Sequence, residues 1–213
     1  MWSNGVRQGI LYVISSPSGG GKTSLVKVLL ARDPLLSASI SHTTRPPRPL
    51  EENHKNYHFV DPKTFAKLEA EGAFIESANV FGYDYGTSRE GVETVLLQGK
   101  DVILAIDWQG GKKVREKMPC KSIFILPPSR ETLLARLNTR GEDKPEVIQH
   151  RMALAEQEMS HYSEYDYVVI NDDFETALQD LAAIFRAERL KRASVEVERK
   201  KLIENLFVRP LTP

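Results

Sequence analysis

The chain has 213 residues, of which 41% are hydrophobic and 27% charged, a composition typical of a globular protein with one large core or two small ones. Its 29 basic and 29 acidic residues cancel, so overall charge gives no reason to expect a nucleic-acid or anionic-membrane partner. Cys120 is the only cysteine and cannot form an internal disulfide, no apolar run is long enough to span a membrane, and the first residues do not resemble a secretion signal. These features predict a cytoplasmic protein.

The first predicted elements are a strand over residues 10–15, a glycine-rich turn, and a helix over residues 23–31. The turn reads Ser16-Pro17-Ser18-Gly19-Gly20-Gly21-Lys22-Thr23. A strand, a glycine-rich turn and a helix in this order are typical of a phosphate-binding P-loop, although Ser16 replaces the usual first glycine. The glycines let backbone N–H groups surround a polyphosphate, Lys22 can reach the terminal phosphates, and the Thr23 hydroxyl can bind the accompanying Mg²⁺. We therefore predict that the chain binds a nucleoside triphosphate.

The segment over residues 40–86 is rich in proline, tyrosine and arginine, with short β-like pieces such as residues 56–60. Asp61 and Pro62 open a short helix through residue 71, as an N-cap followed by proline should. This segment predicts a small inserted subdomain.

Strands and helices alternate in the rest of the chain. The predicted strands are residues 102–107, 122–126 and 167–170, and the predicted helices are residues 90–98, 111–116, 129–139, 146–161 and from 175 onward. Such alternation predicts an α/β protein with a parallel sheet covered by helices. Two further segments stand out: residues 139–145 predict a mobile flap, and the charged tail over residues 187–207 predicts a protruding helix.

Asp107 ends the strand over residues 102–107 and begins the sequence Asp-Trp-Gln-Gly. This sequence fits the D-x-x-G element of a GTPase, but the Asn/Thr-Lys-x-Asp element that reads guanine in GTPases is absent downstream. A GTPase is therefore disfavoured. Asp107 fits a carboxylate near the P-loop that supports hydrated Mg²⁺, and its simpler interpretation is a helix cap.

The subdomain carries groups that suit a nucleoside monophosphate. Arg45 and Arg48 lie among hydroxyl-bearing residues and prolines, and arginine forks bind a phosphate monoester well. Glu76 can accept hydrogen bonds from N1–H and the N2 amino group of guanine, whereas adenine has no donor at N1. Each of these residues taken alone is more often an ordinary surface residue.

The order of these blocks along the chain resembles the guanylate kinase family. The matching segments are SPSGGGKT at 16–23, SHTTRPPRP at 41–49, NYHFV at 56–60, AFIESANVFGYDYGTS at 73–88, IDWQG at 106–110, IFILPPS at 123–129, RLNTRG at 136–141 and YDYVVINDDF at 165–174. The resemblance implies a nucleoside monophosphate kinase fold: a core (residues 1–38, 89–138 and 160–213), a GMP-binding subdomain of mixed β structure (39–88) and a helical lid (139–159). The implied reaction is ATP + GMP to ADP + GDP with Mg²⁺.

The resemblance also implies roles for individual residues. The implied catalytic residues are Lys22, Arg45, Arg136, Arg140 and Arg151, of which the last three are the arginines associated with the lid (the lid arginines). The implied ATP-binding residues are Ser16, Pro17, Ser18, Gly19, Gly20, Gly21, Lys22, Thr23 and, near the adenine, Asn171. The implied GMP-binding residues are of two kinds. Those that would hold the phosphate are Arg45, Arg48, Tyr57 and Tyr85, and those that would read the guanine edge are Ser41, Glu76 and Thr87. The implied metal-binding residues are Thr23 and Asp107. The small-molecule partners are ATP and GMP, with dGMP as a further acceptor, and a homo-oligomer is left open.

Ala105 departs from the family pattern, which usually has an acidic residue at this position near the GMP site. Two alternatives to a guanylate kinase are disfavoured. A guanylate-kinase-like scaffold that binds peptides would have no reason to retain Lys22, Thr23 and the lid arginines. A kinase for another monophosphate is disfavoured by Glu76 together with Ser41 and Thr87.

Overall fold

The structure, a computed structural model, describes residues 7–49, 51–80, 82–138 and 145–207, with the backbone alone for residues 80, 145–148 and 150. Its centre is sheet A, a parallel sheet in the order β2-β7-β1-β8-β9. Its strands are β1 (Leu11–Ser15), β2 (Leu36–Ala38), β7 (Asp101–Ala105), β8 (Lys121–Leu126) and β9 (Tyr167–Ile170). Because β1 is central, the turn that follows it leaves the middle of the sheet at its carboxyl edge.

Helices cover both faces of sheet A, and β1 shows why. Successive side chains of a strand point to opposite faces, so Tyr12 and Ile14 enter one core while Leu11 and Val13 enter the other. The first core is completed by α1 (Lys22–Arg32) and α7 (Phe174–Arg189), and the second by α3 (Arg89–Leu97) and α4 (Trp108–Lys117). The α/β class predicted from the sequence is confirmed.

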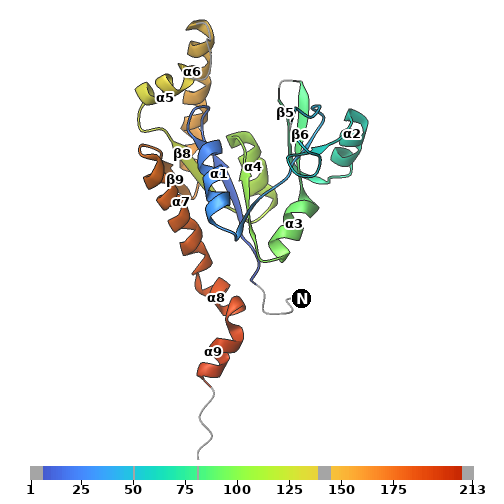
Figure 1. Cartoon of the computed structure of the whole chain (residues 1–213), viewed down its shortest axis with the longest axis vertical. Coiled ribbons are helices and arrows are strands. Elements are labelled where there is room, and N and C mark those ends of the chain that lie inside the picture. The colour runs from blue at the N-terminus through green and yellow to red at the C-terminus, as the bar shows by residue number, and fades with distance from the viewer. Residues whose placement is uncertain (1–6, 50, 81, 139–144, 208–213) are drawn as a thin grey trace, which may run out of the picture.

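Sheet B is separate, with four strands in the order β4-β3-β6-β5. These are β3 (His42–Thr43), β4 (His58–Phe59), β5 (Phe74–Val80) and β6 (Tyr83–Ser88). Helix α2 (Pro62–Ala70) covers sheet B by packing Phe65 on Phe74, with ring centroids 4.7 Å apart. Asp61 caps α2 by accepting from the Thr64 backbone N–H at 2.9 Å, as the sequence predicted. Figure 1 shows sheet B and α2 to one side of the core.

Helices α5 (Arg130–Asn138) and α6 (Pro145–Met159) lie on the other side of the core (Figure 1). They form a small core of their own from Leu133, Leu137, Met152 and Ala155. A short 3-10 helix, η1 (Ser160–Glu164), then leads to β9. Because α5 and α6 share this core, they lie together, and Leu133 of α5 lies against Gly19 in the turn that follows β1.

Two details differ from the sequence prediction. The edge strand β2 was not predicted, because three residues give too short a pattern. The tail is not one helix but α8 (Arg192–Glu198) and α9 (Lys200–Leu206), separated at Arg199. The tail does protrude from the core, as predicted (Figure 1).

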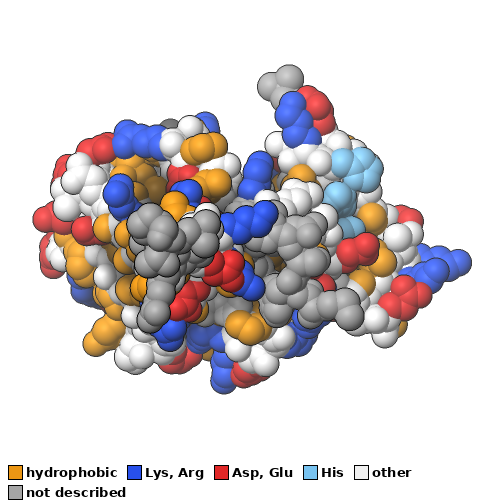
Figure 2. Space-filling view, turned by 90° about the horizontal axis from the view of Figure 1, so that it is seen from below, with side chains coloured by type: hydrophobic (Ala, Val, Ile, Leu, Met, Phe, Trp, Pro, Cys, Tyr) orange, Lys and Arg blue, Asp and Glu red, His pale blue; other side chains and the backbone are white. Residues whose placement is uncertain are grey.

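The surface has no dominant sign of charge on the face seen from the tail side, where basic and acidic side chains are mixed (Figure 2). Within the part of the chain that the structure describes, none of the helices combines the length and the apolar character needed to cross a membrane.

Candidate active site

The P-loop connects β1 to α1 through two glycines in the left-handed region, Gly19 at φ +85° and Gly21 at φ +94°. Only glycine adopts these angles without strain. A side chain at Gly21 is also excluded because its Cβ would lie 2.2 Å from Nδ2 of Asn171. The same Nδ2 donates to the Gly20 carbonyl at 2.8 Å. Asn171, at the end of β9, therefore holds the inner part of the loop.

The loop ends at the N-terminus of α1, which has no side-chain cap and no acidic residue in its first turn. The unpaired N–H groups and the helix dipole at such an end attract an anion. Lys22 projects from this point across the carboxyl edge of sheet A, where its Nζ donates to the Ile106 carbonyl at 2.7 Å. Burial lowers the pKa of Lys22 to about 8, while Asp107 and Glu158 oppose the shift. The arrangement can bind a polyphosphate.

Asp107 follows β7 and caps α4, because its Oδ1 accepts from the Gly110 backbone N–H at 2.7 Å. The side chain is exposed, as is that of Thr23 at the start of α1. Among the described residues, no group of three or more histidine, cysteine or acidic side chains could hold a metal by itself. Asp107 is therefore a helix cap, as its simpler interpretation predicted. Only Oδ1 takes part in the cap, so Oδ2 stays outside it.

Glu76 and Thr87 form a buried pair across the β5–β6 hairpin. Their backbones are in register, and Thr87 Oγ1 donates to Glu76 Oε1 at 2.5 Å. Burial raises the pKa of the Glu76 carboxyl, and the Thr87 hydrogen bond partly opposes this rise. The structure thus brings together two of the residues predicted to read guanine.

Arg45 lies among aromatic rings and one acid. Its guanidinium is 5.5 Å from the ring centroid of Tyr57, and the Tyr57 and Tyr85 rings are 5.9 Å apart. Its NH2 group donates to both carboxylate oxygens of Glu51 at 2.9 Å. Three of the residues predicted to bind the GMP phosphate therefore cluster.

Two predicted GMP-binding residues remain, Ser41 and Arg48. The hydrogen bonds described for them involve their backbone atoms. The Ser41 carbonyl accepts from the His58 N–H, and the Arg48 N–H donates to Glu51. The sequence did not predict Glu51 as part of this site. The only available signal was an acidic residue three positions after Arg48 and six after Arg45.

Two of the three lid arginines are described, and they lie on different helices. Arg136 lies on α5 and donates from NH2 to the Asn171 carbonyl at 3.1 Å, so it sits beside the residue that holds the P-loop. Arg151 is half-buried on α6. Arg140 lies outside the described residues, together with most of the predicted flap.

Comparison with known proteins identifies the family. A guanylate kinase family model matches residues 8–188. The chain belongs to the guanylate kinase family. A guanylate kinase of Alkalilimnicola ehrlichii is 62% identical over 182 residues, covering 85% of this chain and 90% of the relative. That of Escherichia coli K12 is 53% identical over 203 residues, covering 94% and 98%. The crystal structure of a guanylate kinase from Anaplasma phagocytophilum has a TM-score of 0.70 at 34% identity, covering 93% of this chain and 98% of that one.

Ala105, the departure from the guanylate kinase pattern, lies at the last position of β7, opposite Ile14 of β1. The four residues before it in the strand are buried, whereas Ala105 is exposed. It is therefore not a core residue, and a larger polar side chain at this position would reach solvent.

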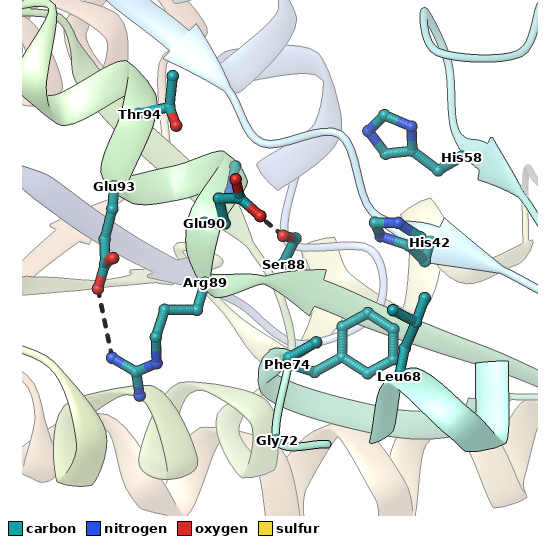
Figure 3. A pocket seen from close by; sticks show the side chains of 12 residues that line it. His42, His58, Leu68, Gly72, Phe74, Ser88, Arg89, Glu90, Glu93 and Thr94 are labelled. Atoms are coloured by element: carbon teal, nitrogen blue, oxygen red, sulfur yellow. Dashed lines mark hydrogen bonds and ion pairs between the residues drawn. The ribbon is translucent and has the colours of Figure 1, made fainter. Parts of the chain in front are cut away.

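A cavity of about 570 Å³ lies between sheet B, the end of α2 and the start of α3 (Figure 3). His42, Phe74 and Ser88 line it. Thr87 is adjacent to Ser88 and so points to the other face, and Glu76 pairs with Thr87 because a β-bulge between Phe74 and Glu76 breaks the alternation of β5. The cavity is thus separate from the residues predicted to bind GMP.

Proposed function

We propose that the chain catalyses the reaction of its family at the carboxyl edge of sheet A, transferring the γ-phosphoryl group of ATP to GMP to give ADP and GDP. One observation carries the assignment of the site: the segment Ile106–Gly110 contacts both halves. The Ile106 carbonyl accepts from Lys22 of the P-loop. At the other end, a Cβ on Gly110 would lie 3.3 Å from Glu76 Oε2. The phosphate-binding lysine and the base-reading carboxylate thus flank one short segment.

The acceptor in this reaction is a phosphate that is already ionised near neutral pH, so no strong general base is required. The protein must align the two phosphates, exclude water and stabilise the charge of the transferred group. Lys22 supplies positive charge on the ATP side, and Arg45 and Arg48 supply it on the GMP side. Arg136, Arg140 and Arg151 would surround the transferred group, with closure of the lid when substrates bind.

Recognition of guanine rests on the buried Glu76–Thr87 pair. The Glu76 carboxylate would accept from N1–H and the N2 amino group, and the Ser41 hydroxyl would donate to O6 or N7. The single proton of the Thr87 hydroxyl goes to Glu76, so Thr87 would donate to the base only after turning away from Glu76. A buried carboxylate left without these donors is costly, so a base that lacks them is rejected more strongly than on an exposed surface.

The donor set near the P-loop fits Mg²⁺. Mg²⁺ takes few protein ligands, keeps several waters and binds substrate phosphates, which suits one exposed hydroxyl and one exposed carboxylate. Thr23 would hold the ion directly and Asp107 would hold its waters. When bound with ATP, the ion neutralises charge on the β- and γ-phosphates. A cytoplasmic location, use of dGMP and any homo-oligomer stay predictions.

A coupled assay with ATP and Mg²⁺ and with GMP, AMP, UMP or dTMP as acceptor tests the proposal. We expect GMP to be the preferred acceptor.

The variant Lys22→Met tests the role of the P-loop lysine in the same assay. We expect it to lower kcat by about 10³-fold or more, because one positive charge at the phosphates is worth this much in phosphoryl transfer. The matched control is Lys27→Met, an exposed lysine on the same helix, which should keep wild-type kcat. If Lys22→Met kept more than about a tenth of kcat, Lys22 would not have this role.

A further inference from the structure

Glu158, one residue before the end of α6, contacts the P-loop although no motif assigns it a role. The Ser18 backbone N–H donates to Glu158 Oε2 at 3.1 Å, across 140 residues of sequence. A hydrogen bond to an ionised acceptor is stronger than one between neutral groups. This contact therefore ties the outer part of the loop to α6.

The charges around Glu158 are those of the phosphate site. The side chain is half-buried, and burial raises the pKa of its carboxyl, with a further rise from Asp107. The Ser18 N–H and Lys22 act in the opposite direction. Glu158 is therefore within electrostatic reach of both Lys22 and Asp107, unlike an acid on the outer surface of the helix.

Glu156, two residues earlier on the same helix, shows the difference. Its exposed carboxylate forms an ion pair with Arg130 Nε at 2.6 Å on the surface. Exposed ion pairs contribute little to stability. Glu156 is thus a residue of the same type and helix without contact to the P-loop.

The geometry of α6 connects Glu158 to the lid. Arg151 and Glu158 are seven residues apart, close to two helical turns, so they lie on the same face of α6. The loop also touches α5, because a Cβ on Gly19 would lie 3.0 Å from Leu133 Cδ1. Leu133 belongs to the small core that joins α5 to α6. The outer part of the P-loop therefore rests on both helices.

We infer that Glu158 is a positioning residue for phosphoryl transfer, which holds Ser18 and so fixes the P-loop against the helix that carries Arg151. The inference rests on the proposed function, since it concerns the same site. Glu158 acts through the loop and through the orientation of α6, and makes no contact with the reacting phosphates. A change at Glu158 should therefore alter KM for ATP and kcat, and leave KM for GMP unchanged.

The kinetic experiment compares Glu158→Ala, Glu158→Gln and the control Glu156→Gln, with KM measured separately for ATP and GMP. We expect Glu158→Ala to lower kcat/KM for ATP about tenfold or more, since hydrogen bonds to charged groups are worth that factor, with KM for GMP unchanged. Glu158→Gln should recover most of the loss because its amide oxygen still accepts from Ser18. Glu156→Gln should match the wild type.

Amide hydrogen exchange in residues 18–20 without nucleotide gives a readout that does not need catalysis. We expect faster exchange in Glu158→Ala than in the wild type or Glu156→Gln. This result would stand even if the Lys22→Met test contradicted the proposed function. Should Glu158→Ala not fold, Glu158→Asp takes its place, since it keeps the charge but shortens the side chain.

Three results would overturn the inference. Unchanged exchange would mean that Glu158 does not hold the loop. Equal losses in Glu158→Gln and Glu158→Ala would mean that the charge matters and the hydrogen bond does not. Tighter ATP binding in both variants would mean that the carboxylate competes with the phosphates for the Ser18 N–H.

Discussion

Burial and hydrogen bonding act in opposite directions at Glu76. Burial raises the pKa of its carboxyl, and the Thr87 hydroxyl lowers it. Guanine would add two further donors to this carboxylate, and so would compensate for its loss of water. A buried carboxylate with only one hydrogen bond in place gives high selectivity, because any ligand without the missing donors leaves it unsatisfied.

Glu76→Gln tests this selectivity. The amide can accept one hydrogen bond from guanine, but its NH₂ group then faces a second donor, at a cost of about 1–3 kcal/mol. We expect kcat/KM for GMP to fall by this amount while that for AMP changes little. Glu71→Gln, an exposed acid near the start of the same hairpin, is the control. An unchanged GMP-to-AMP ratio in Glu76→Gln would contradict the assignment.

Ala105 allows a second test at the scale of one residue. Because Ala105 is exposed, we expect Ala105→Asp to keep the wild-type Tm and to alter affinity for GMP or Mg²⁺, since a new carboxylate would flank Asp107. The buried neighbour Leu104 is the control: Leu104→Asp should destabilise the fold by several kcal/mol, about the cost of a buried unpaired carboxylate. Thermal unfolding and titration with GMP and Mg²⁺ measure both effects. A large fall in Tm for Ala105→Asp with unchanged affinities would contradict this prediction.

At the scale of elements, β3, β4 and the turn before β4 bring three histidines together. The His42 and His58 rings stack at 4.5 Å, and the Nδ1 atoms of His54 and His58 are 2.8 Å apart. One imidazole must donate and the other accept, so at least one is neutral. Burial and the neighbouring histidines lower the pKa of His42 and of His58. Histidines gather visibly at this edge of the molecule (Figure 2).

The sign of the resulting pH dependence follows from these shifts. In the folded protein, His42 and His58 bind protons less readily than they do in the unfolded chain. Their contribution to stability is therefore present above the ordinary histidine pKa of 6.5. It is lost as the pH falls through their lowered pKa values. We therefore expect the free energy of unfolding to decrease between pH 7 and pH 5, and to decrease less in the double variant His42→Asn/His58→Asn. Urea unfolding at several pH values measures this difference, and equal slopes in the two proteins would contradict the prediction.

At the scale of the whole molecule, the buried core and the family match both end before the tail. Neither α8 nor α9 contains a buried residue, and the family model matches only to residue 188. Leu206 and Phe207 are 72% and 79% exposed. By contrast, Arg189, the last residue of α7, pairs with Asp101 at 2.6 Å and with Asp33 at 2.7 Å, so α7 contacts the core up to its last residue.

Truncation after Lys191 should therefore leave the enzyme intact. We expect kcat unchanged and Tm within about 2–4 °C of the wild type, the shift that corresponds to roughly 1 kcal/mol in a protein of this size. Sedimentation velocity of both forms shows at the same time whether the tail holds subunits together. A severe loss of stability or activity in a truncated protein that keeps the wild-type mass would show that the tail supports the core itself.

The sequence by itself determined the features that depend on neighbouring residues. The glycines of residues 19–21 with Lys22 predicted the P-loop, apolar runs predicted four of the five strands of sheet A, and Asp61 and Pro62 predicted the start of α2. These features follow from backbone preferences and from periodic burial, which a few adjacent residues specify. The family resemblance added the reaction, and the family comparisons confirm it.

Only the tertiary structure decided which distant residues meet. It paired Glu76 with Thr87, set Asn171 against Gly20, and brought Glu158 to Ser18 across 140 residues. It also showed Ala105 to be exposed. None of these contacts leaves a local pattern, because each depends on how whole elements pack, and a buried polar group takes whichever partner that packing supplies.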